Sequence, residues 1–229
     1  AASFSWPHDS TNENKNIQVS DGGGNGPVAI STGDFTVCGW VKADDADERN
    51  GIISDGYYVY GSNDGWGLGM KGGAWRWNVN NAATGLSALG SSTSTTTDWT
   101  HLCGIRDDEG RKLFVNGVLD ASDANAIGLD ASNTNDLNFG VRSSVPSQSP
   151  RGPFNGAISD VRIYTSALSS EEILTLSETN PVITGMYASI PSTEAGWWKL
   201  DEDFSSGVTA ADSSGNGNTG TNNGAETYY

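Results

Sequence analysis

The sequence is poor in the residues that build metal clusters and catalytic centres. Its 229 residues include only two histidines and two cysteines, and the Gly-x-Ser-x-Gly motif of serine hydrolases does not occur. No stretch approaches the run of about 18 apolar residues that a membrane-spanning helix requires. We therefore expect neither a His- or Cys-rich metal centre, nor a serine nucleophile, nor membrane insertion.

Basic residues are also scarce. The chain carries 12 Lys and Arg against 28 Asp and Glu, which gives a formal net charge of -16 at pH 7. Nucleic acids and anionic lipid headgroups associate with clusters of Lys and Arg, so neither is expected as a partner. Carboxylates are ligands for calcium, although a solvated acidic surface accounts for most of them.

Glycine, by contrast, is abundant, with 30 residues. Because Gly readily adopts the positive φ of tight turns, this abundance favours many short strands. Apolar residues alternate with period two between the turns. The expected strands cover 17–19, 35–42, 52–60, 66–70, 75–79, 99–106, 111–115, 137–141, 157–164 and 197–200. The pattern predicts an all-β sandwich of two antiparallel sheets.

Two local signals are sharper than the rest. The dipeptide Asn116-Gly117, between two expected strands, is typical of a type I′ hairpin turn. A short helix is expected over 170–177, because Ser169 and Glu172 have the spacing of a capping box. Its apolar side is supplied by Ile173, Leu174 and Leu176.

Four segments carry a family resemblance. They are Phe35-Thr-Val-Cys-Gly-Trp-Val-Lys42, Trp99-Thr-His-Leu-Cys-Gly-Ile-Arg-Asp107, Leu113-Phe-Val-Asn-Gly-Val118 and Phe154-Asn-Gly-Ala-Ile-Ser-Asp-Val-Arg-Ile-Tyr164. These segments resemble bacterial laminin-G-like domains of the concanavalin A-like class. The resemblance implies a two-sheet jelly roll, often with structural calcium, whose members bind glycans or proteins or serve as spacers in adhesins.

Hydrolases that share this fold carry Glu-x-Asp-x-x-Glu on one strand, where two carboxylates flank the scissile bond. That motif is absent from this sequence. We therefore expect a protein that is not an enzyme.

The two cysteines, Cys38 and Cys103, both lie in expected strands. The residues alone leave a disulfide and two buried thiols equally open. Pentraxins, a related branch, place a disulfide between neighbouring strands at these positions, so the resemblance favours the disulfide. The sequence opens with Ala1-Ala2-Ser3 and no Met, as a secreted product does after signal-peptide cleavage. We expect an extracellular or cell-surface protein.

The C-terminal part departs from the family order, because the segment over 196–220 is similar to one that normally comes first. We expect a jelly-roll body over 1–180, a connector over 181–195, and over 196–229 a strand and loop that complete a jelly roll. A sandwich without its first strand exposes a sheet edge. The residues expected to fill that edge are Trp197, Trp198, Lys199 and Leu200.

The strand can fill the edge in two ways. It can fold back onto its own chain, or it can insert into the next copy as in donor-strand exchange. Exchange between copies repeats head to tail and builds a filament. Our main hypothesis is a structural or adhesive subunit that self-associates into such a filament. The alternative is a monomeric, calcium-dependent carbohydrate-binding module resembling a lectin.

A calcium site is expected in the same tail. Asp212, Ser214, Asn216 and Asn218 place side-chain oxygens at alternate positions of one loop, a spacing that can wrap a hard cation. The resemblance suggests that Asp160 contributes a further carboxylate. An ordinary Asn/Gly turn is the alternative.

Tryptophans provide candidate glycan contacts. Exposed indoles at Trp75 and Trp77 would stack on sugar rings, and Trp66 beside Asn63 and Asp64 is a second candidate platform. Core packing is the favoured interpretation of these indoles, because a sandwich needs large inward-facing residues.

Overall fold

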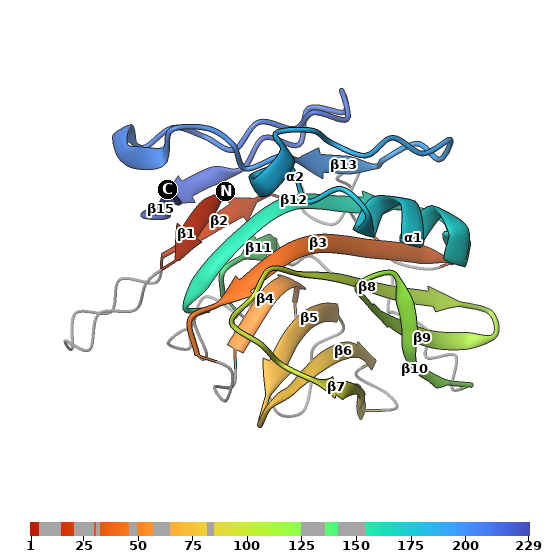
Figure 1. Cartoon of the computed structure of the whole chain (residues 1–229). Helices are drawn as coiled ribbons and strands as arrows, with labels where there is room; N and C mark the ends of the chain where they lie inside the picture. The colour runs from red at the N-terminus through yellow and green to blue at the C-terminus, as the bar shows by residue number, and fades with distance from the viewer. Residues whose placement is uncertain are drawn as a thin grey trace.

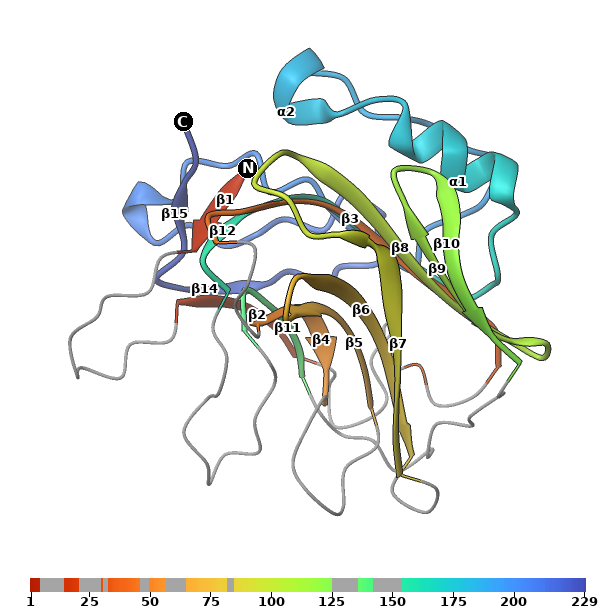
Figure 2. The ribbon, with the colours of Figure 1, turned by 60° about the horizontal axis from the view of Figure 1, so that its bottom comes forward.

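The computed structural model describes residues 1–4, 15–20, 30, 33–45, 50–56, 65–81, 85–124, 136–141 and 154–229. Two antiparallel sheets stack face to face across these residues (Figures 1 and 2). This arrangement confirms the predicted two-sheet sandwich. No helix within the described ranges is long and apolar enough to cross a bilayer.

Sheet A is organised around one long central strand, β12. The order is β10 (Val118–Asp123), β9 (Gly110–Val115), β8 (Thr100–Asp107), β3 (Phe35–Ala43), β12 (Gly156–Tyr164), β1 (Ala2–Phe4) and β15 (Glu226–Thr227), with β13 (Gly196–Trp198) also paired to β12. The predicted turn joins β9 to β10, with φ of 51° at Asn116 and 80° at Gly117. Both values are positive, as a type I′ turn requires.

Sheet B forms the second layer. Its order is β14 (Thr221–Asn223), β2 (Asn16–Val19), β11 (Leu137–Phe139), β4 (Asn50–Asp55), β5 (Gly65–Lys71), β6 (Ala74–Asn81) and β7 (Gly85–Ser94). Strand β7 was not predicted. Its residues are mostly small or polar, and it lies at the edge of the sheet with β6 as its one strand partner. An edge strand needs less apolar alternation, so the period-two signal is weak there.

The core between the sheets holds the three indoles that were candidates for sugar contacts. Trp66, Trp75 and Trp77 are each 0% exposed. The Trp77 Nε1 donates a hydrogen bond of 2.9 Å to the Ile105 carbonyl of sheet A. The prediction that these indoles bind a glycan is therefore wrong, because they have no surface to offer. Asn63 and Asp64 lie outside the described residues.

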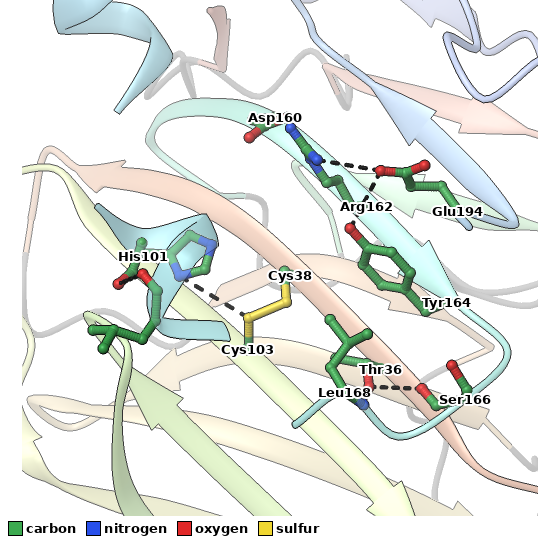
Figure 3. Close-up of a disulfide and its surroundings, with 12 residues drawn as sticks. Thr36, Cys38, His101, Cys103, Asp160, Arg162, Tyr164, Ser166, Leu168 and Glu194 are labelled. Carbon is green, nitrogen blue, oxygen red and sulfur yellow. Dashed lines mark hydrogen bonds and ion pairs between the residues drawn. A yellow bond between two sulfur atoms is a disulfide. The ribbon is translucent and has the colours of Figure 1, made fainter. Parts of the chain in front are cut away.

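The outer face of sheet A carries a second, smaller apolar cluster. The disulfide between Cys38 and Cys103 is confirmed, and it joins the paired strands β3 and β8 (Figure 3). Helix α1 (Ser170–Ser177) begins with the predicted capping box. Its buried residues Ile173 and Leu176 pack into the same cluster as the disulfide. The helix and the disulfide together cover this side of the sandwich.

The C-terminal segment completes the sandwich within its own chain. Strand β13 pairs with one half of β12, where Val161 lies opposite Trp198, and β1 pairs with the other half. The Trp198 indole is fully buried, and its Nε1 donates to the Asn218 carbonyl at 2.7 Å. The Tyr228 amide donates to the Ala1 carbonyl at 2.9 Å. The two ends of the chain thus lie side by side (Figure 1).

This closure corresponds to the fold-back alternative. The edge of sheet A that strand exchange would need to leave open is filled by the same molecule. Exchange between copies and a filament gain no support from it, and both stay predictions.

The connector contains a one-turn helix that was not predicted, α2 (Pro181–Thr184). The Asn180 side chain accepts a hydrogen bond from the Val182 amide, and Gly185 ends the turn with φ of 67°. Asn as a cap, Pro at the first position and Gly after the last are the usual signals of helix ends. A second short turn, the 3-10 helix η1 (Phe204–Ser206), lies in the tail.

Candidate ligand-binding face

Residue alternation divides sheet B into an inner and an outer face. Successive side chains of a strand point to opposite faces. Because Trp75 and Trp77 of β6 are buried in the core, Arg76 and Asn78 between and after them point outward. The residues in register with Arg76 and Asn78 on neighbouring strands share that outer face.

A row of amides and small residues crosses the middle of the outer face. Each member lies directly opposite the next in the strand register. The row consists of Gln18, Asn138, Ser54, Gly67 and Asn78. We refer to these five residues as the amide row. They come from five consecutive strands, β2, β11, β4, β5 and β6, so the fold alone brings them together.

Hydrogen bonds hold the amide row in place. The Gln18 Nε2 donates to Asp136 Oδ2 at 2.6 Å, and the Asn16 Nδ2 donates to Asn138 Oδ1 at 2.7 Å. The Asn78 Nδ2 donates to the Gly67 carbonyl at 3.3 Å. An amide side chain can both donate and accept. Ser54, Asn78 and Asn138 are 0%, 3% and 6% exposed, and Gln18 is half-buried. Gln18 is therefore the member of the row best placed to meet the hydroxyl groups of a ligand.

Glycines form the floor of the face beside the amide row. In strand β5 the outward residues Gly65, Gly67 and Gly69 alternate with the core residues Trp66 and Leu68. A glycine inside a strand weakens it, and often marks a place where a ligand or another backbone approaches closely. No β5 side chain therefore rises between β4 and β6 along these three positions.

The face carries a cation at one end. Arg76 lies between two glycines, Gly69 of β5 and Gly90 of β7, in the strand register. A Cβ atom built on Gly90 would lie 3.0 Å from the Arg76 Cζ. The guanidinium therefore rests against the backbone of β7, which only glycine permits.

The predicted calcium loop is held together by its own hydrogen bonds. The Asp212 Oδ1 accepts from the amides of Trp197 and Ser214 at 3.0 and 2.9 Å, and Oδ2 accepts from the Asn218 amide at 2.9 Å. Burial raises the pKa of the Asp212 carboxyl, but these hydrogen bonds and one from the Ser214 hydroxyl bring it below its usual range. Both oxygens are thus directed at N–H and O–H donors.

The side-chain amides of the same loop donate to the backbone of the connector. The Asn216 Nδ2 donates to the carbonyls of Glu194 and Ala195 at 3.1 and 3.0 Å, and the Asn218 Nδ2 donates to Ala195 at 3.0 Å. In this arrangement Asp212, Asn216 and Asn218 tie the loop to the connector. The residues as arranged do not fit a calcium ion, and calcium binding stays a prediction.

Asp160, the other proposed calcium ligand, lies in a buried charge cluster on sheet A (Figure 3). Its Oδ1 accepts from Arg162 Nε at 2.9 Å and from Trp197 Nε1 at 2.7 Å. Burial raises the pKa of the Asp160 carboxyl, while the Arg162 charge opposes that rise. Arg162 is also paired with Glu194 at 3.2 Å. A carboxylate already paired with a guanidinium is a poor ligand for a cation.

The residues predicted for strand exchange divide between two surfaces. Trp198 and Leu200 are buried in the core, and Trp197 and Lys199 face the outer side of sheet A. The Trp197 ring lies 4.3 Å from the Arg162 Cζ and 4.8 Å from the Lys199 Nζ. These contacts fasten the tail to the body of its own chain.

The amide row was not predicted as a site. Gln18 and Asn138 lie in the short segments Asn-Ile-Gln-Val and Leu-Asn-Phe, where each alternates with buried apolar residues. The same alternation that identifies the core therefore also identifies the outward residues. What the sequence lacks is the strand order, which places residues more than a hundred positions apart next to each other.

Comparisons with known proteins agree with this architecture. A family described as the concanavalin A-like lectin/glucanases superfamily matches residues 11–174. No curated protein sequence matches the chain significantly. A Bacteroides ovatus protein provisionally described as carbohydrate binding has a similar structure, with a TM-score of 0.68 and 19% identity. The similarity covers 98% of this chain but 58% of that protein.

Two further solved structures are similar over most of their own length. A heptameric pentraxin from Limulus polyphemus has a TM-score of 0.57 at 13% identity, covering 84% of this chain and 89% of the pentraxin. The CBM40 module of the Ruminococcus gnavus IT-sialidase, bound to α2,3-sialyllactose, has a TM-score of 0.57 at 17% identity, covering 71% and 93%. Such identities show the fold alone. The family match spans most of the sequence, and this chain therefore belongs to the concanavalin A-like lectin/glucanase superfamily, as a laminin-G-like domain.

Proposed function

We propose that the protein is a non-catalytic carbohydrate-binding module that holds its glycan against the outer face of sheet B. The observation that carries this proposal is the amide row above the glycines of β5. Sugars present many hydroxyl groups, which amides bind in both donor and acceptor roles. The outer face of sheet A is occupied by α1, the disulfide and the tail.

The comparisons support a binding role. One similar structure is provisionally described as carbohydrate binding, and another is a carbohydrate-binding module with a bound sialyllactose. The chain spans 58% of the length of the first of these proteins.

Catalysis is not part of the proposal, although the superfamily includes glucanases. Glycoside hydrolysis uses two carboxyl groups on either side of the scissile bond. Of the described residues on the outer face of sheet B, Asp136 is the single carboxylate, and it accepts a hydrogen bond from Gln18. One carboxylate in this role does not supply an acid and a base.

The disulfide supports an extracellular location, because disulfides persist in oxidising compartments. We propose that the module acts as a monomer, since its own tail completes the sandwich. Size-exclusion chromatography with light scattering tests this directly. A mass of one chain is expected, and concentration-dependent polymers would restore the filament hypothesis.

A pair of amide substitutions tests the site. We expect Gln18→Ala, at the half-buried end of the amide row, to weaken binding of the best glycan on an array by about tenfold, which corresponds to about 1.4 kcal/mol, the size of one hydrogen bond. Asn216→Ala, in the tail loop, is the control and leaves the affinity unchanged. Isothermal titration calorimetry gives both affinities, and circular dichroism verifies folding. Equal affinities for wild type and Gln18→Ala would contradict this location.

A further inference from the structure

The cation on the outer face of sheet B suggests a particular class of sugar. Building on the proposed glycan site, we propose that Arg76 selects glycans that contain a carboxylate-bearing sugar. The inference depends on the glycan lying on this face, and it adds which functional group the face prefers.

The strand register holds Arg76 in an open setting. Its cross-strand neighbours are glycines on both sides, Gly69 and Gly90, so no side chain rises next to it in that row. The guanidinium lies against Gly90 and is half-buried. Asn78, the next outward residue of β6, is buried beside it and bonded to the Gly67 carbonyl. A sugar ring over these positions would meet the guanidinium.

Arg76 has no acidic partner among the described residues. The cations of the ion pairs among the described residues are Lys15, Arg111, Lys112 and Arg162. Arg76 takes part in none of these pairs. Its Nε is buried and lacks a hydrogen-bond acceptor. The residue as a whole is half-buried, so a ligand would meet the exposed part of the guanidinium.

The guanidinium fork matches a carboxylate. Arg presents parallel N–H donors that bind both carboxylate oxygens at once, and such charge-assisted hydrogen bonds are stronger than neutral ones. Neutral sugars offer hydroxyls, which the amides already suit. Among the substituents of a sugar, a carboxylate therefore forms the strongest hydrogen bonds with Arg76.

The overall charge narrows the ligand class further. With a net charge of -16, the protein repels polyanions at long range. Densely sulfated chains need a cluster of cations to bind, whereas Arg76 stands beside glycines and amides, with Lys71 exposed at the end of β5 as the next outward cation. We therefore expect an isolated carboxylate, as in a uronic acid or a sialic acid, to bind more tightly than a densely sulfated polymer.

The test uses pairs of oligosaccharides that differ only in whether one sugar carries a carboxylate. We expect the acidic member of a pair to bind wild type at least tenfold more tightly than the neutral member. Arg76→Gln is expected to remove this preference while neutral binding is retained. Gly90→Ala displaces the guanidinium without changing the net charge, and it is expected to reduce the preference as well. Lys199→Gln, on sheet A, makes the same charge change as Arg76→Gln and is expected to keep the preference.

The outcomes separate this inference from the proposed function. Equal binding of acidic and neutral members by wild type overturns the selection by Arg76, while the carbohydrate-binding function stands. If Arg76→Gln lowers the affinity for the acidic and the neutral oligosaccharide equally, the inference is also overturned, because Arg76 then contacts both kinds of glycan alike. Binding of no glycan at all overturns the function and the inference together. Thermal melting verifies that each variant is folded, and Arg76→Gln decides alone if Gly90→Ala does not fold.

Discussion

The two outer faces of the sandwich are built in opposite ways. On sheet A the outer face carries a disulfide and aromatic residues, and α1 and the tail cover it. On sheet B the outer face carries amides, glycines and Arg76, and the hydrogen bonds among its described residues link polar side chains to one another. The first face adds a second core. The second carries a polar row in which Gln18 and Arg76 are half-buried and can meet a ligand.

The difference shows how one fold separates stability from recognition. Substitutions on the covered side of sheet A remove buried contacts and are expected to lower stability. Substitutions of the half-buried polar residues of sheet B, Gln18 and Arg76, are expected to change affinity. The predictions below are given in order of decreasing effect on stability, and the disulfide variant tests this division directly.

Trp198→Ala is expected to have the largest effect, because it removes a fully buried indole of the tail. The ring packs against Phe139 of sheet B with centroids 5.2 Å apart. Truncating a buried tryptophan costs about 3–5 kcal/mol of unfolding free energy. Denaturant unfolding measures the loss, and Trp197→Ala, on the outer surface, is the control with a smaller loss. Equal losses would show that the tail does not contribute to the core.

Replacing both cysteines by alanine is expected to cost about 2–4 kcal/mol, since the bond closes a long loop between Cys38 and Cys103, 65 positions apart. Unfolding of the double variant gives this value. Glycan affinity at 25 °C is expected to stay unchanged, because the disulfide lies on the opposite sheet. A loss of affinity in the folded double variant would contradict the division between the faces.

Acid is expected to destabilise the protein through His101. Burial, with a smaller contribution from the charge of Arg162, lowers the pKa of His101 from 6.5 to about 3. The unfolded chain therefore takes up a proton below pH 6.5 that the folded chain does not, so stability falls as the pH drops from 6.5 toward 3. The slope of this contribution is about 1.4 kcal/mol per pH unit.

The raised pKa of Asp160 acts with the opposite sign over part of this range. The contribution of His101 is therefore read as the difference between wild type and His101→Gln. Unfolding free energies at pH 6.5 and 5 give that difference, which is expected to be about 2 kcal/mol smaller at pH 5. A difference that does not change with pH would show that His101 is protonated in the folded state.

Removing metal ions is expected to have the smallest effect. Because the Asp212 oxygens accept hydrogen bonds from amides, excess chelator is expected to leave the melting temperature unchanged. Differential scanning calorimetry with EDTA, and then with added calcium, measures this. A melting temperature that falls with EDTA and recovers with calcium would restore the predicted calcium site and show that the loop rearranges around the ion.

Local signals in the sequence predicted local structure well. The turn at Asn116-Gly117 and the capping box of α1 were both confirmed, because neighbouring residues alone determine them. The strands of the core followed from alternation. The short terminal strands β1, β14 and β15 contain too few residues to show a period.

The candidate site was harder to predict. Alternation in β6 indicated two faces, with Trp75 and Trp77 on one and Arg76 and Asn78 on the other. Core packing was the favoured interpretation of the indoles, and a glycan contact was the other. Their burial follows from packing against sheet A, which no local pattern reports. The amide row depends on strand order. Whether the Asp212 oxygens are available to a cation depends on which backbone amides they bond to in the folded chain. Both are properties of the assembled fold.

The most direct test of the central claim is a map of amide chemical shifts in two-dimensional NMR spectra during titration with the strongest oligosaccharide from a glycan array. The account predicts that the largest shift changes occur in β4, β5 and β6, around Ser54, Gly67 and Asn78, while α1 and β13 stay unchanged. Changes confined to α1, β13 or the tail loop would contradict it.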